Sequence, residues 1–134
     1  MVELALVESV PCFIDLPKGT KEALAGAFDE VTVPVGQRII SQGDFAYELF
    51  VILEGTALVE QDGNVVATLG NGDLCGEIGL LLTGRRTAAI VADTPMRLLA
   101  LFDQSFRQIS RGHPEFASLV HSKSGGRFSR PATV

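Results

Sequence analysis

Residues 76–89 read GEIGLLLTGRRTAA and place a carboxylate, an apolar segment, a glycine-bounded loop and two adjacent arginines close together in the chain. The segment 77–82 interrupts a series of short strand patterns and predicts a single helical turn. The start of a helix attracts anions because its first N–H groups have no acceptors within the helix. A guanidinium can also pair with a phosphate through two parallel hydrogen bonds. The stretch therefore predicts a phosphate site.

The carboxylate of Glu77 narrows the chemistry of the expected ligand. It repels a phosphate, but it can accept hydrogen bonds from the neighbouring hydroxyl groups of a sugar. A phosphate and sugar hydroxyls in one small pocket indicate a nucleotide-like ligand. The alternative is an ordinary surface pair between Glu77 and an arginine in a turn, which needs no ligand.

Short strand patterns separated by glycine-containing turns lie on both sides of this stretch. Turns at intervals of about eight to twelve residues favour a β-sandwich, a jelly roll or a small barrel. Glycine suits such turns because it adopts positive φ angles without strain. The expected strands are 31–35, 37–41, 48–53, 56–60, 65–69, 86–92 and 96–102.

Helical patterns flank the β region at both ends. Near the N-terminus, Thr20 is expected to cap a helix over 21–28. After the last strand, a helical face around Phe106 is followed by a second helix over about 115–121. We expect residues 1–121 to form one domain and residues 122–134, which are rich in Gly, Ser and basic residues, to form a flexible basic tail.

Length and charge exclude several classes of protein. The chain has 134 residues, enough for one domain with a proper core. Its net charge is −5, and residues 1–120 hold all 16 acidic residues but only eight of the 11 basic ones. An acidic body argues against direct DNA binding, because a duplex reader needs a basic face for the phosphates. The apolar runs are too short for a membrane span.

The cysteines and histidines do not form a recognisable reactive or metal site. Cys12 and Cys75 are far apart in sequence, and His113 and His121 both lie in the expected C-terminal helices. No metal site of the cupin type can be built from them. The sequence also lacks a P-loop and a G-x-S-x-G motif. We therefore expect no metal, no cofactor and no enzymatic activity. Two cysteines and the lack of a secretory signal favour a cytoplasmic protein.

The stretch 76–89 resembles the phosphate-binding cassette of the cyclic-nucleotide-binding domain family. This family includes catabolite activator proteins, protein kinase A regulatory subunits and cyclic-nucleotide-gated channels, and the double arginine followed by threonine is most similar to the channels. Turn glycines at 43, 55 and 72 extend the resemblance over roughly residues 10–121. The residues that match the cassette pattern are Gly76, Glu77, Ile78, Gly79, Leu80, Arg86, Thr87 and Ala88.

The resemblance implies a mainly β fold with flanking helices. Its centre is an eight-stranded antiparallel β-roll, similar to a jelly roll, with a short helical phosphate-binding cassette. An N-terminal helix and C-terminal helices complete it.

The resemblance also implies roles for the residues that meet the phosphate and the ribose. Arg86 would pair with the exocyclic oxygens of the cyclic phosphate, and Glu77 would accept from the ribose 2′-OH. The N–H groups of Gly76, Ile78 and Thr87 would complete the cradle.

Three further positions are implied around the rest of the ligand. Leu74 would line the apolar floor of the pocket, and Val65 and Ala88 would contact the base. The Thr87 hydroxyl would reach the phosphate or the base, and a bond to the guanine amino group is one option. Arg85 is expected to be the solvated neighbour of Arg86.

The implied function is a regulatory module in signal transduction that senses cAMP or cGMP, with cAMP favoured. It would act on a protein partner, or on a second copy of itself, through the C-terminal helices. Because the helix over 115–121 is short, weak discrimination between the two nucleotides is expected. The chain lacks the DNA-binding helices and membrane spans of larger family members, and its initial Met favours a stand-alone module over a fragment.

Two alternatives remain open. The first is an interaction or dimerisation module that keeps the family fold but has lost physiological nucleotide binding. The second is a metal-free enzyme of the cupin type, which turnover of cAMP would reveal.

Overall fold

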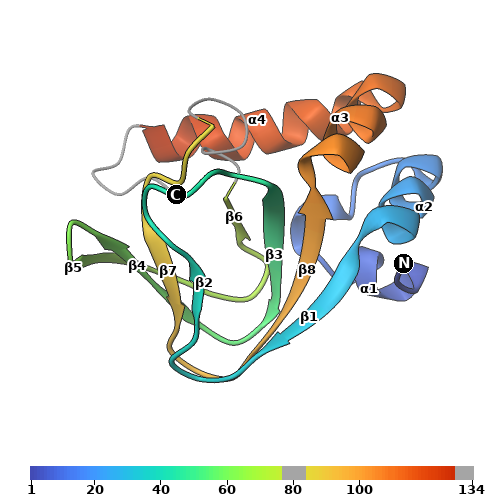
Figure 1. The fold of residues 1–134 in the computed structure, drawn as a ribbon. Helices are drawn as coiled ribbons and strands as arrows, with labels where there is room; N and C mark the ends of the chain where they lie inside the picture. The colour runs from blue at the N-terminus through green and yellow to red at the C-terminus, as the bar shows by residue number, and fades with distance from the viewer. Residues whose placement is uncertain (77–83, 129–134) are drawn as a thin grey trace.

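The computed structural model describes residues 1–76 and 84–128, and Figure 1 shows the arrangement of their helices and strands. The described residues form a β-roll between N-terminal and C-terminal helices. The strands are β1 (Asp29–Val33), β2 (Arg38–Ile40), β3 (Glu48–Glu54), β4 (Ala57–Gln61), β5 (Asn64–Leu69), β6 (Leu74–Cys75), β7 (Ala89–Ala92) and β8 (Met96–Phe102). The helices are α1 (Leu4–Glu8), a 3₁₀ turn (Pro11–Phe13), α2 (Lys18–Ala27), α3 (Asp103–Gly112) and α4 (Pro114–Phe128).

The strands pair in two four-stranded sheets with the orders β1-β8-β3-β6 and β2-β7-β4-β5. Every pairing between these strands is antiparallel. The predicted antiparallel roll of eight strands is therefore confirmed. All seven strands expected from the sequence are present with ends within three residues of the prediction. The pattern missed β6, because two residues are too few to show an alternation of apolar and polar positions.

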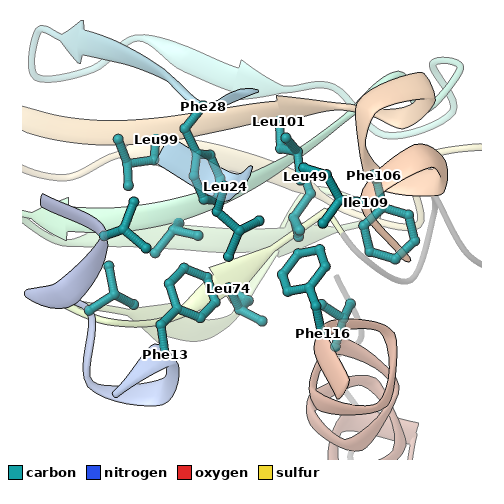
Figure 2. Packing of buried hydrophobic residues seen from close by; sticks show 14 of the residues in the cluster. Phe13, Leu24, Phe28, Leu49, Leu74, Leu99, Leu101, Phe106, Ile109 and Phe116 are labelled. Atoms are coloured by element: carbon teal, nitrogen blue, oxygen red, sulfur yellow. The ribbon is translucent and has the colours of Figure 1, made fainter. Parts of the chain in front are cut away.

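The central strands β3 and β8 are apolar on both faces, and they separate two buried clusters. Leu49 and Val51 face one side of β3, whereas Phe50 and Ile52 face the other, as the period of two requires. We call the first cluster the helix-side core, because most of its members come from the helices and their ends (Figure 2). The second cluster fills the roll interior between the two sheets and includes Ala88.

The helix-side core gathers aromatic rings from helices that are far apart in the sequence. Phe13 lies 6.1 Å from both Phe28 and Phe116, measured between ring centroids. Phe106 of α3 lies 5.6 Å from Phe116 of α4. Figure 2 shows these rings packed against Leu49, Leu74, Leu99 and Leu101 of the sheet.

The predicted capping role of Thr20 is wrong. Helix α2 begins at Lys18, and Pro17 occupies the N-cap position. The Thr20 side chain is fully buried, and its hydroxyl donates to the carboxylate of Glu115. The same oxygen lies 3.0 Å from Nδ1 of His113. A tertiary contact between α2 and the start of α4 thus takes the hydroxyl that the sequence pattern assigned to a cap.

The C-terminal helix is longer than predicted. Helix α4 covers 15 residues, so residues 122–128, which the sequence pattern assigned to the tail, belong to the helix. Residues 129–134 lie outside the described residues. The buried side chains of Phe116 and Val120 anchor the first turns. Each glycine in a helix costs only about 1 kcal/mol, so the pair at 125–126 weakens the helix without ending it.

In the view of Figure 1, α4 crosses above the end of the roll, from α3 toward the side of β4 and β5. Among the described residues, no helix is both long and apolar enough to cross a membrane.

Candidate functional site

Arg86 lies in the connection that leads into β7, and only 6% of its surface is exposed. Its backbone is held by the turn at residues 43–44. The N–H of Arg86 donates to the carbonyl of Asp44 at 2.7 Å, and its carbonyl accepts from the N–H of Gly43 at 2.9 Å. These two bonds fix the direction in which the side chain leaves the backbone.

The guanidinium group of Arg86 reaches two more segments of the chain. Its Nη2 donates to the carbonyl of Glu48 at 2.9 Å, and its Nη1 donates to the carbonyl of Gly76 at 3.2 Å. Nη2 also lies 3.3 Å from Oε1 of Glu48, which completes an ion pair. A buried charge is costly unless it is paired and hydrogen-bonded, and these contacts meet that requirement. We call Gly43, Asp44, Glu48, Gly76 and Arg86 the Arg86 junction.

Burial is the main electrostatic influence on this arginine. It lowers the pKa of Arg86 below the usual value, and the neighbouring carboxylate of Glu48 opposes that shift. An arginine remains charged throughout the physiological range even so. The site therefore offers an anion a fixed cation with little competing water, and charges interact more strongly in such surroundings than in bulk water.

Gly76 is required by the geometry of the junction. Its φ is +89°, in the left-handed region that other residues rarely adopt. A β-carbon on Gly76 would lie 2.6 Å from Nη1 of Arg86 and 3.0 Å from the carbonyl oxygen of Glu48. Only glycine lets the backbone approach the guanidinium this closely.

A cavity of about 400 Å³ opens beside the junction, within the size range of small-molecule sites. Arg85 lies on its wall and is exposed, as predicted, but it is not simply solvated. Its guanidinium carbon lies 3.9 Å from the centroid of the Phe45 ring, and its Nη1 donates to the carbonyl of Gly43 at 3.1 Å. Phe45 and Tyr47 add exposed aromatic surface to the same wall.

Part of the predicted site comes together around Arg86. The carbonyl of Gly76 binds the guanidinium directly. Thr87 is half-buried, and its carbonyl accepts from Nε2 of Gln61, at the end of β4, at 3.2 Å. Ala88 is buried in the roll interior. Glu77 and Ile78 lie outside the described residues.

Leu74 and Val65 do not join this group. Leu74 packs in the helix-side core, as Figure 2 shows, so its side chain leaves β6 on the face away from the roll interior. Its neighbour Cys75 faces that interior instead, because successive side chains of a strand alternate between faces. Val65 is 56% exposed on β5 and belongs to neither buried cluster.

The sequence pattern gave no reason to select Glu48, whose carbonyl and carboxylate both accept hydrogen bonds from Arg86. The two residues are 38 positions apart, and no local pattern connects them. The sole sequence signal is a charged residue at the edge of the apolar run of β3.

Comparisons with known proteins bear on the family and the fold of the chain. The family profile of the cyclic nucleotide-binding domain matches residues 30–113. The chain is 35% identical, over 105 residues, to a cAMP-dependent protein kinase regulatory subunit from Schizosaccharomyces pombe. That match covers 78% of this chain and only 25% of the relative.

Two solved structures have the same fold. The regulatory domain of Toxoplasma gondii PKA, crystallised with cAMP, has a TM-score of 0.80 at 20% identity, and the match covers 94% of this chain and 48% of that one. The regulatory subunit of a cAMP-independent protein kinase A from Trypanosoma brucei has a TM-score of 0.75 at 27% identity, with 86% and 44% covered. The profile match and the identity to the regulatory subunit show that the chain belongs to the cyclic nucleotide-binding domain family.

Proposed function

We propose that this chain is a regulatory module that binds cAMP reversibly, accepts cGMP as a second ligand and converts neither. The single observation that carries the proposal is Arg86, a buried cation whose guanidinium and backbone are both held by hydrogen bonds. A binding module needs such a preorganised charge, because the cost of ordering it has been met before the ligand arrives.

The phosphate of the nucleotide would take its place at the Arg86 guanidinium. A charge-assisted pair of hydrogen bonds is roughly twice as strong as a neutral one, and the fork of arginine matches two phosphate oxygens. The proposed cradle adds the N–H groups of Gly76, Ile78 and Thr87. Gly76 is suited to this role, because it already brings the backbone against the guanidinium.

The sugar and the base would be recognised by the remaining residues. We assign the ribose 2′-OH to the carboxylate of Glu77, and contact with the base to Ala88, Val65 and the hydroxyl of Thr87. Leu74 is assigned a supporting role below the pocket, since it packs in the helix-side core.

Occupancy of the site would be relayed to a partner through the C-terminal helices. Gly76 binds Arg86, and two residues earlier Leu74 packs in the same core as Phe116 of α4. A ligand that shifts Gly76 would therefore change how α4 packs on the helix-side core, through a short chain of contacting residues. The partner would be another protein or a second copy of this chain.

Calorimetry tests the proposal. We expect saturable binding of cAMP and cGMP, and much weaker binding of adenosine 5′-monophosphate, whose phosphate is not cyclic. Chromatography after long incubation should return cAMP unchanged. Glu77→Ala should weaken the binding of cAMP but not the binding of 2′-deoxy-cAMP, because the carboxylate is assigned to the 2′-OH. If neither cAMP nor cGMP binds to the chain at millimolar concentration, the proposal is refuted.

A second candidate is a module with the same fold that does not bind cyclic nucleotides in the cell. The match to a regulatory subunit of a cAMP-independent kinase favours keeping this candidate. It predicts no response to either nucleotide and a stable dimer or complex whose mass, measured by light scattering, does not change when cAMP is added.

A further inference from the structure

We propose that Glu48 is an internal counter-ion that competes with the ligand phosphate for Arg86 and so lowers the affinity of the site. This inference rests on the proposed function, because it assumes that the anion bound at Arg86 is the phosphate of a cyclic nucleotide.

Both acceptor groups of Glu48 converge on one nitrogen atom. Its backbone carbonyl lies 2.9 Å from Nη2 of Arg86, and its carboxylate oxygen Oε1 lies 3.3 Å from the same atom. Since Nη2 carries two hydrogens, these two bonds use its full donor capacity. A phosphate that pairs with Nη2 must replace one of the two acceptors.

The carboxylate is the acceptor that can leave. The carbonyl of Glu48 belongs to the first residue of β3 and is held by the strand. The side chain of Glu48 is 28% exposed, whereas that of Arg86 is 5% exposed. Glu48 also lines the cavity of about 400 Å³, so its carboxylate can turn away from Arg86 and toward solvent.

The carboxylate is also the acceptor that a bound phosphate would repel. Two negative groups at one nitrogen repel each other, and the repulsion is strong where water is excluded. The carbonyls of Glu48 and Gly76 are neutral, and they keep the guanidinium in place without the carboxylate. The structure thus separates two tasks: the carbonyls position Arg86, and the carboxylate balances its charge.

The test compares three variants by calorimetry with cAMP, each at the same salt concentration. Glu48→Gln removes the charge and keeps the shape, and Glu48→Ala removes the contact altogether. Glu60→Gln is the matched control, because Glu60 is a carboxylate of similar exposure, 26% against 28% for Glu48, that pairs with a different arginine, Arg38. A thermal unfolding curve for each protein confirms that it is folded.

We expect both Glu48 variants to bind cAMP about tenfold more tightly than the natural chain, and Glu60→Gln to change the affinity by less than about threefold. If the natural chain binds cAMP and the Glu48 variants bind equally or more weakly, Glu48 only positions Arg86 and the inference is overturned while the proposed function stands. If neither the natural chain nor Glu48→Gln binds, the proposed function fails and the inference fails with it. Binding by Glu48→Gln alone would refute the proposed function for the natural chain while supporting the competition at Arg86.

Discussion

The helix-side core and the Arg86 junction are both buried, yet different interactions hold them. The helix-side core consists of apolar side chains from both ends of the chain, and burial of apolar surface has no directional requirement. The junction consists of directional bonds between a guanidinium, two carbonyls and a carboxylate. Damage to the core should therefore cost stability, whereas damage to the junction should change the affinity for the ligand and leave the fold nearly intact.

The largest expected effect is on the core. Phe116→Ala removes a fully buried ring that contacts rings from two other segments. Loss of a buried Phe side chain costs about 3–5 kcal/mol of the free energy of unfolding. Urea denaturation followed by circular dichroism measures this change. A loss below about 1 kcal/mol would show that α4 contributes little to the fold.

Arg86→Ala tests the Arg86 junction, the other region in this comparison. We expect cAMP affinity to fall by at least about a hundredfold, because the phosphate loses a charge-assisted pair and its only assigned counter-charge. The unfolding curve should change far less than for Phe116→Ala. Calorimetry measures the first effect and urea denaturation the second.

Arg85→Ala is the matched control for that prediction, since Arg85 is exposed and stacks on Phe45. Its effect on binding should be no more than a few-fold. Equal losses for the two arginines would mean that Arg86 is not the specific phosphate ligand.

Gly76→Ala sharpens the comparison, because it adds a single methyl group at the junction. The new β-carbon would lie 2.6 Å from Nη1 of Arg86, so the guanidinium must move. The positive φ adds about 1 kcal/mol or more of backbone strain. We expect a loss of about tenfold or more in cAMP affinity and a modest loss of stability. Gly36→Ala is a control at a glycine with a similar φ and open space around it, and it should affect stability alone. Unchanged binding by Gly76→Ala would contradict the assigned cradle.

The smallest expected effect concerns the base. Thr87→Ala should lower the affinity for cGMP by a few-fold and leave the affinity for cAMP nearly unchanged, because one neutral hydrogen bond contributes about 0.5–1.5 kcal/mol. Competition of each nucleotide against a fluorescent cAMP analogue measures the ratio. The expectation of weak discrimination also relied on a short C-terminal helix, and the 15 residues of α4 remove that support. A preference above a hundredfold that survives Thr87→Ala would assign selectivity to α4.

The sequence by itself determined most of the strand pattern, and its resemblance to a known family implied the antiparallel roll. The strand pattern and the family motif depend on residues that are close together in the chain, such as the alternation over residues 31–35. An alternating strand must place its apolar side chains on defined faces wherever it lies in the fold. The prediction that Arg86 is a site residue followed in the same way, from a compact motif.

The tertiary structure alone decided which distant groups meet. It paired Arg86 with Glu48, turned Leu74 toward the helices, used Thr20 to bind α4 and extended α4 to Phe128. These outcomes depend on strand register and on how the loops close, and both are set by the packing of the whole domain. Local propensity is weaker than that packing, so a residue such as Thr20 takes its role from the neighbours that folding brings to it.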